Sequence, residues 1–402
     1  MRRDVPYGMR PDAGLPVPPY WEASLAGAPV GADPPGGGER LLEAAGGYWA
    51  RRGLESDAGH VLAAPGAEPL LLALLAATGG DLVLARPAAA WQEPVARLLG
   101  RPTHSVPTPP EGGGVPDPFA LLETVRRARA AGGDPRLLVV SAADDPTGTV
   151  TAPELLHETC EAATEAGLLI VSDETFADTL HHHDTVLLSP AEMLPDHTVV
   201  LTDLGATLVP GTVPAALARF PATAHGAAWR GRTLAVLAAL RAVLLAPVAS
   251  AAAYVLTEPA EVTEWIAAAN RLHARTAAAA YRVLTGAGAT CRPPAAGFQL
   301  YPTLRAPGLG AEALEERLTA LLGRPTPGGH HFGDDPNEPR VRIDTGALHG
   351  TTEAERRTAL TAADPLAVPH VAAALTTLAD ALATLAHPSD ASAETGSPAP
   401  GS

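Results

Sequence analysis

The chain has 402 residues, of which 46% are hydrophobic and 18% charged, and its formal net charge at pH 7 is −16. This length and composition predict a globular protein with two lobes and a large core. The negative charge argues against non-specific binding to nucleic acid or to an anionic membrane. The longest apolar run, from Ala242 to Thr257, is short and broken by Pro247, so we expect no membrane span.

The cysteines and the first residues indicate a cytoplasmic protein. Cys160 and Cys291 lie far apart and have no metal-ligand spacing, which is typical of a reducing compartment. The start, MRRDVPYGMRPD, has no apolar segment that resembles a signal peptide. All 28 residues counted as lysine or arginine are arginines, so the chain has no lysine.

Residues 1–39 are rich in Pro and Gly and predict an arm with little regular structure, lying on the body or on a partner subunit. The helical spacing of Leu41, Leu42, Ala45 and Trp49 then predicts a helix that ends before Gly53. This helix marks the start of the body of the protein.

Short apolar runs then alternate with helical stretches, and this pattern predicts a mostly parallel sheet covered by helices on both faces. The expected strands are Leu82–Ala85, Leu137–Val140, Leu168–Val171 and Val199–Leu201. Two of the expected helices are Pro118–Ala131 and Pro153–Ala166. Ligands of such sheets bind beyond the carboxyl ends of the strands, where residues 141–148, Asp173 and Thr202 fall.

The second half predicts a smaller α+β domain. Glu261–Leu284 has the apolar spacing of a long amphipathic helix that would connect the two domains. We therefore expect an arm over residues 1–39 that forms part of the small domain, a large α/β domain over 40–285 and a small α+β domain over 286–386. The last residues, 387–402, have the composition of a disordered tail.

Two motifs near the centre resemble the class I/II aminotransferases of pyridoxal-phosphate fold type I. Ser172, Asp173 and Glu174 match the family's S-D-E-x-Y motif, and Thr202, Pro210 and Gly211 match its S-x-S-K-x(4)-P-G-x-R motif. The resemblance extends over roughly residues 14–386. It implies a large domain with a seven-stranded type of sheet, a smaller C-terminal domain and a homodimer whose cleft lies between two subunits.

The same comparison of motifs indicates that several cofactor contacts are absent. Gly205 stands at the position of the lysine that forms the Schiff base, and Val213 at that of a phosphate-binding arginine. Phe176 replaces the tyrosine and Asp145 the asparagine that contact the cofactor's phenolic oxygen. Glu68 and Pro69 weaken the expected phosphate site, since Glu68 adds negative charge at a helix start and Pro69 lacks an amide hydrogen. These residues predict that no cofactor is bound, or that pyridoxal phosphate is bound non-covalently at best.

Other residues keep their counterparts in the family. Asp173 matches the aspartate that pairs with the pyridine nitrogen, Trp91 the aromatic residue over the ring, and Arg342 the clamp for the substrate carboxylate. We therefore predict Asp145 and Asp173 as catalytic acid/base residues, with Trp91, Phe176, Thr202 and Arg342 binding a small-molecule substrate. Each could instead be structural: a core tryptophan, a turn aspartate, a fold-stabilising aspartate or a salt-bridge arginine. HExxH and CxxC spacings are absent, and the run 181–184 (HHHD) predicts a polar loop, so we expect no metal site.

Three functions remain open. The chain could be a pyridoxal-phosphate-independent biosynthetic enzyme that performs a cyclisation, isomerisation, elimination or condensation on an amino-acid-like or planar amine. It could be a non-catalytic homologue, acting as a binding protein or as the silent partner of an active aminotransferase. It could also bind pyridoxal or pyridoxamine phosphate without a covalent bond. A lysine amine normally holds this cofactor and moves its proton, which is why an ordinary transaminase is not among the three.

Overall fold

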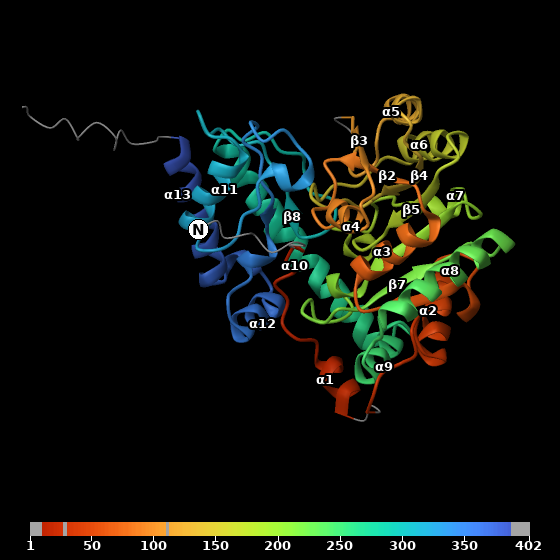
Figure 1. The fold of residues 1–402 in the computed structure, drawn as a ribbon. Coiled ribbons are helices and arrows are strands. Elements are labelled where there is room, and N and C mark those ends of the chain that lie inside the picture. The colour runs from red at the N-terminus through yellow and green to blue at the C-terminus, as the bar shows by residue number, and fades with distance from the viewer. Residues whose placement is uncertain (1–9, 27–29, 110–111, 387–402) are drawn as a thin grey trace, which may run out of the picture.

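The computed structural model describes residues 10–26, 30–109 and 112–386. Within these residues the large domain is built on a seven-stranded sheet in the order β1-β7-β6-β5-β4-β2-β3 (Figure 1). The strands are β1 (Val61–Ala64), β2 (Asp81–Arg86), β3 (Thr103–Pro107), β4 (Pro135–Val140), β5 (Leu169–Asp173), β6 (Thr198–Asp203) and β7 (Ala216–Arg219). β7 runs antiparallel to both of its neighbours and the other pairings are parallel, so the prediction of a mostly parallel α/β sheet is confirmed.

Helices cover both faces of this sheet. They are α2 (Glu39–Arg51), α3 (Ala67–Thr78), α4 (Gln92–Leu98), α5 (Pro118–Ala130), α6 (Pro153–Glu165), α7 (Pro190–Met193), α8 (Ala224–Leu240) and α9 (Ala246–Val255). Leu82 and Leu84 of β2 pack in one core cluster with α3 and α4, whereas Val83 between them packs with α5 and α6. Successive strand residues point to opposite faces, so an almost wholly apolar strand is what a sheet covered on both sides requires.

The second domain is smaller. It contains α11 (Ala311–Leu322), α12 (Glu353–Thr361), α13 (Pro369–Ala386) and the two-stranded pair β8 (Gln299–Leu300) and β9 (Ile343–Asp344). The helix α10 (Ala260–Gly286) lies between the sheet and these elements (Figure 1). The predicted domain boundaries stay predictions, and the predicted disordered tail, 387–402, lies outside the described residues.

The arm differs from expectation in one respect. Residues Pro19–Ala26 form a helix, α1, which packs against α9. Tyr20 and Trp21 are buried in the same core cluster as α2 and α9. Two buried aromatic residues can stabilise a short helix. The high Pro and Gly content of the arm predicted little regular structure, so this helix was not expected.

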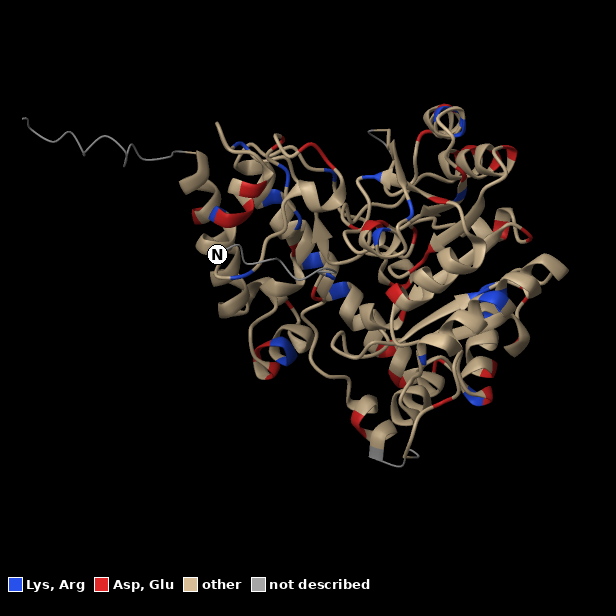
Figure 2. Cartoon of the chain, in the orientation of Figure 1, with Lys and Arg blue, Asp and Glu red and all other residues tan. Residues whose placement is uncertain are grey.

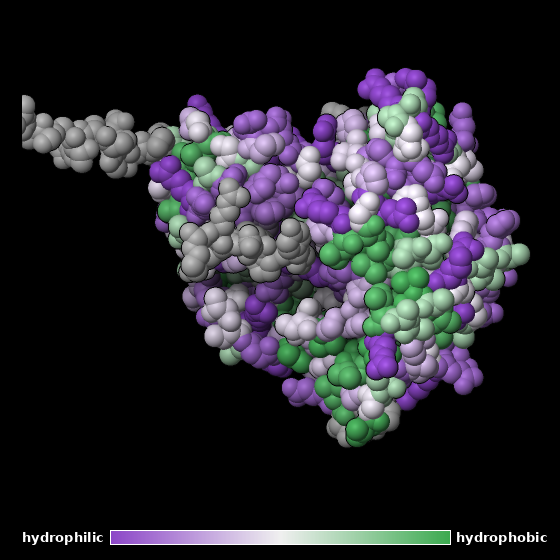
Figure 3. All heavy atoms as spheres, in the orientation of Figure 1, coloured by the Kyte–Doolittle hydropathy of each residue, from purple (hydrophilic) through white to green (hydrophobic). Residues whose placement is uncertain are grey.

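The surface carries charges of both signs in the described part of the chain. In Figure 2 the arginines are dispersed among acidic residues over both lobes. Hydrophobic residues reach the surface around α1 and α9, at the bottom of the view in Figure 3; Val30 and Leu245 are among the exposed large hydrophobic residues. One described helix, α13, is long and apolar enough to cross a membrane by length and composition alone, and it packs against α10 and α11.

Candidate functional site

A pocket lies where β5 and β6 end. Asp173 is the last residue of β5 and Asp203 the last of β6. Because the two strands are parallel neighbours, their carboxyl ends bring both carboxylates to one edge of the sheet. The pocket is lined by Arg10, Pro11, Ala67, Trp91, Asp145, Asp173, Thr175, Phe176, Asp203, Gly205, Ala206, Gly211 and Phe298.

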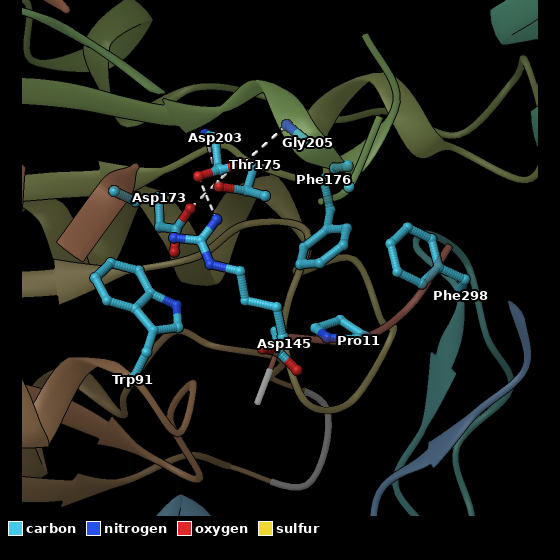
Figure 4. Close-up of a pocket in the computed structure, with 13 residues that line it drawn as sticks. Pro11, Trp91, Asp145, Asp173, Thr175, Phe176, Asp203, Gly205 and Phe298 are labelled. Carbon is cyan, nitrogen blue, oxygen red and sulfur yellow. Dashed lines mark hydrogen bonds and ion pairs between the residues drawn. The ribbon is translucent and has the colours of Figure 1, made fainter. Parts of the chain in front are cut away.

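The predicted pair of carboxylates faces this pocket from two sides. Figure 4 shows Asp145 across the pocket from Asp173 and Asp203, with Trp91 on one flank and Phe176 and Phe298 on the other. Asp173 accepts hydrogen bonds from the Thr175 amide at 3.2 Å and from the Gln92 amide group at 3.4 Å.

Burial changes the acidity of these groups. It raises the pKa of Asp145 to about 6, against the opposing effect of Arg342. Burial also raises the pKa of Asp173, which hydrogen bonds from Thr175 partly offset. The neighbouring Asp144 has its pKa raised to about 7, again mainly by burial. Taking a carboxylate out of water disfavours its charged form, so these side chains can exchange protons at a higher pH than exposed aspartates.

Arg10, from the arm, enters the pocket between acidic residues. Its Nε and Nη2 donate to Glu68 Oε1 and Oε2 at 3.0 and 2.5 Å, and its Nη1 forms an ion pair with Asp203. The guanidinium carbon lies 5.9 Å from the centre of the Trp91 ring. Burial lowers the pKa of Arg10, but the carboxylates of Asp203 and Glu68 outweigh it, so the pKa is raised overall. The free volume left in the pocket is about 50 Å³.

The apolar side of the pocket consists of aromatic rings. Phe176 and Phe298 meet edge to face, with ring centres 5.4 Å apart. Trp91 immediately precedes α4 and is buried. Together these rings can hold a flat or cationic group next to the carboxylates.

Two predicted binding residues lie elsewhere. Thr202 is buried within β6, opposite Leu217 of β7, and does not line the pocket. Arg342 is 1% exposed and does not line it either. Its Nε donates to Asp344 at 2.9 Å and its Nη1 to Asp145 at 3.3 Å. Arg342 therefore acts on the pocket through Asp145 in this structure, and its role as a carboxylate clamp stays a prediction.

Gly205, at the position of the Schiff-base lysine in the motif, does line the pocket. Its amide donates to Asp203 Oδ1 at 2.8 Å. A Cβ atom at this glycine would lie 3.0 Å from that oxygen and 3.5 Å from the Gly211 Cα. A side chain therefore fits here if the Asp203 carboxylate moves by a few tenths of an ångström.

Sequence reasoning missed Asp203 and Arg10. Asp203 occupies a variable position of the family motif, so no motif singled it out, although its place at the end of a strand could have. Arg10 lies in an arm for which no residue pattern predicted a contact with the cleft.

Two histidine-rich segments, one with His181 and one with His330 and His331, bear on the question of a metal site. The Nε2 atom of His181 lies 2.8 Å from the Gly297 carbonyl oxygen, and burial lowers the pKa of His181. Among the described residues, one group has the spacing to hold a metal ion: Glu315, His330 and His331. None of the three lines the pocket, and the expectation of no metal site stays a prediction.

Comparison with known proteins finds a family model that matches most of the chain and two relatives that match part of it. Residues 34–359 match the family model described as aminotransferase class I and II. A probable aspartate/prephenate aminotransferase of Thermus aquaticus is 31% identical over 172 residues, 42% of this chain and 43% of the relative. The aspartate/prephenate aminotransferase of Thermus thermophilus is 32% identical over 123 residues, 31% of this chain and 30% of the relative. These alignments span less than half of either relative.

Solved structures extend the likeness in fold. The aspartate aminotransferase from Thermus thermophilus with maleate has a TM-score of 0.75 and 21% identity, with 92% of this chain and 90% of that chain covered. N-Succinyldiaminopimelate aminotransferase from Mycobacterium tuberculosis has a TM-score of 0.72 and 22% identity, with 92% and 91% covered. At this identity the likeness establishes the fold.

These findings correct one expectation. The prediction that the protein takes no cofactor is wrong, because the matched family and both curated relatives are aminotransferases. The family that the motifs resemble uses pyridoxal phosphate, and the matches point to that cofactor.

Proposed function

We propose, from the premise that the chain belongs to the class I and II aminotransferases, that it is an enzyme of this family without the Schiff-base step. The reaction that its residues support is acid–base chemistry on an amine-bearing or planar substrate, such as a cyclisation, isomerisation, elimination or condensation. The observation that supports this proposal is the pair Asp145 and Asp173, two buried carboxylates with raised pKa values that line one pocket.

The two carboxylates would have different tasks. Arg342 lies 3.3 Å from Asp145 and favours its ionised form, so Asp145 would be the base that takes a proton from the substrate. Asp173 has no arginine hydrogen-bonded to it in the described structure, although the charge of Arg10 partly offsets the rise of its pKa by burial, and Asp173 would be the acid. Pairs of groups whose surroundings separate their proton affinities are a common basis of such catalysis. Trp91 would hold the substrate through its flat face.

The residues fit part of the cofactor that the family uses. Asp173 and Trp91 suit a protonated pyridine ring. The opposite end suits a phosphate poorly, because Glu68 and Asp203 place two carboxylates there, and the chain has no lysine to form an imine. Pyridoxal phosphate would therefore be held without a covalent bond to a lysine, and we derive no step of the reaction through it.

Two measurements test this proposal. Titration calorimetry with pyridoxal phosphate, followed by borohydride reduction and mass spectrometry of the protein, should give binding and an unmodified mass. A reduced pyridoxyl adduct on the chain would contradict the loss of Schiff-base chemistry. Incubation of amine-bearing compounds in D₂O should reveal deuterium uptake or a mass change, and Asp145→Asn and Asp173→Asn should each abolish it. Retention of the reaction in both variants would refute the assigned acid and base.

One observation favours a second candidate, a non-catalytic binding protein or silent partner subunit. The pocket is filled by Arg10 and retains about 50 Å³, whereas a pocket that takes a small molecule usually has several hundred. Co-purification of an active aminotransferase with the tagged chain, without any reaction by the chain alone, would decide for this candidate. Cytoplasmic location remains a prediction under either candidate.

A further inference from the structure

The side chain of Arg10 occupies the pocket as a ligand would. Each nitrogen of its guanidinium faces a carboxylate: Nε and Nη2 contact Glu68, and Nη1 contacts Asp203. A planar guanidinium paired in parallel with a carboxylate is among the strongest polar contacts in proteins. The Trp91 ring lies against the same group at 5.9 Å. We call Glu68, Asp203, Asp173 and Trp91 the Arg10 cage.

The charge of the cage explains what it selects. Asp203 is 4% exposed and Asp173 7% exposed, and the positive charge of Arg10 lowers the pKa of each against the effect of burial. Without Arg10, the cage would hold three carboxylates next to an aromatic face. Such a site attracts a cationic group.

In the described part of the chain, the backbone that follows Arg10 is held by contacts beyond the pocket. Asp12 pairs with Arg356 at 2.9 Å, and Gly14 packs so closely on Gly346 that a Cβ atom at Gly14 would lie 1.8 Å from the Gly346 oxygen. Among the described residues, Arg10 and Pro11 are the part of the arm that lines the pocket. Displacing Arg10 therefore leaves the anchorage of the arm on the small domain unchanged.

From these contacts we infer that the Arg10 cage is a binding site for a small molecule with a guanidinium group, and that Arg10 is its intramolecular stand-in. A guanidinium compound would be one class of the amine-bearing substrates proposed above, and as a statement about the substrate the inference rests on the proposed function. A free ligand must compete with a tethered side chain whose effective concentration is of the order of millimolar or higher. Binding to the wild-type protein should therefore be weak, and removal of Arg10 should strengthen it.

The test compares arginine and agmatine, which carry a guanidinium, with citrulline, in which a neutral urea group replaces it. Calorimetry should give a dissociation constant for arginine and agmatine at least about tenfold lower for Arg10→Ala than for wild type. Citrulline should not bind to either protein. Arg10→Gln, which keeps the length of the side chain without its charge, should behave like Arg10→Ala and serves if the alanine variant folds poorly.

Matched variants locate the site. Arg136→Ala removes an exposed arginine that pairs only with Asp134 among the contacts described and should leave binding unchanged. Asp203→Asn in the Arg10→Gln background should reduce the affinity for agmatine at least about tenfold, since it removes a charge-assisted contact. Equal affinity of wild type and both Arg10 variants for agmatine would overturn the inference.

A second result would also overturn it. If Arg10→Gln bound pyridoxal phosphate more weakly than wild type and gained no affinity for agmatine, Arg10 would be a phosphate ligand. Because these measurements record binding without turnover, they fail independently of the proposed reaction. Agmatine that binds but undergoes no reaction would retain the inferred site and count against the enzyme.

Discussion

Replacing Arg342 by alanine should destabilise the protein strongly. The side chain is 1% exposed, its Nε is 2.9 Å from Asp344 and its Nη1 is 3.3 Å from Asp145, and its guanidinium carbon lies 5.3 Å from the centre of the Phe332 ring. Removing one partner of a buried ion pair leaves the other charge uncompensated, at a cost of about 3–5 kcal/mol. That is a large part of the roughly 5–15 kcal/mol by which domains are typically stable.

Urea unfolding followed by circular dichroism at pH 7 measures this loss. The pH dependence adds a second, signed expectation. Without Arg342 the pKa of Asp145 should rise further, because the guanidinium is the main group that opposes the effect of burial. Protonation of Asp145 and Asp344 then relieves the uncompensated charge, so the destabilisation by Arg342→Ala should shrink as the pH is lowered from 7 towards 4.

A triple variant provides the control. Combining Arg342→Met with Asp145→Asn and Asp344→Asn removes all three charges and should recover much of the lost stability, as replacement of whole buried ion pairs often does. A loss below about 1 kcal/mol for Arg342→Ala, the range of exposed ion pairs, would refute the reasoning. If substrate binding were weakened at the same time, Arg342 would instead be the carboxylate clamp that the motif suggests.

Four further predictions concern the site and the assembly. Gly205→Lys should form a borohydride-reducible imine with pyridoxal phosphate, because a Cβ atom fits there after a small shift. Gly205→Arg, which cannot form an imine, is the control. A folded Gly205→Lys variant that forms no imine would contradict the likeness of this site to that of the family. Asp145→Asn should lower turnover about 10²–10⁴-fold, and wild-type turnover should fall as the pH drops through about 6, where the base becomes protonated; a flat pH profile would count against Asp145. Because the pKa of Asp145 is raised, the native state binds more protons than the unfolded chain between about pH 4 and 6. The free energy of unfolding of the wild type should therefore fall as the pH rises through this range, and that of Asp145→Asn should fall less. Light scattering should give the mass of a homodimer, with an interface of over about 2,000 Å² that includes the apolar surface around Val30 and Leu245; a monomer at micromolar concentration would refute it.

The sheet could be predicted because its strands are short apolar runs between strongly periodic helices. The predicted Leu137–Val140 and Val199–Leu201 lie within β4 and β6, and the predicted Glu261–Leu284 within α10. β3 and β7 escaped prediction. β3 has a mixed sequence, THSVP, because it lies at the edge of the sheet. The direction of β7 depends on its pairing with strands that are distant in the sequence, and local patterns carry no information about that.

The site could be predicted only where a motif or a strand end fixed the residue. Asp145, Asp173, Trp91, Phe176 and Gly205 all line the pocket. Thr202 and Arg342 do not, since a match to a motif position does not specify where a side chain points once its neighbours have changed. Arg342 in particular is held by Asp344 and Asp145, and Asp145 would, by the match that we predict, replace a neutral residue of the family motif.

The changes around the pocket are linked by charge. We propose that Gly205 and Val213 stand where the family motif has a lysine and an arginine, so that two positive charges would be missing from this end of the strands. Glu68 and Asp203 place acidic side chains there, and burial raises the pKa of Asp203, so this edge of the sheet needs a cation. Arg10 supplies it from the arm, and because Arg10 is tethered by a few residues rather than built into the sheet, a ligand can take its place. On this proposal, the missing positive charge would give this end of the pocket a preference for a cation.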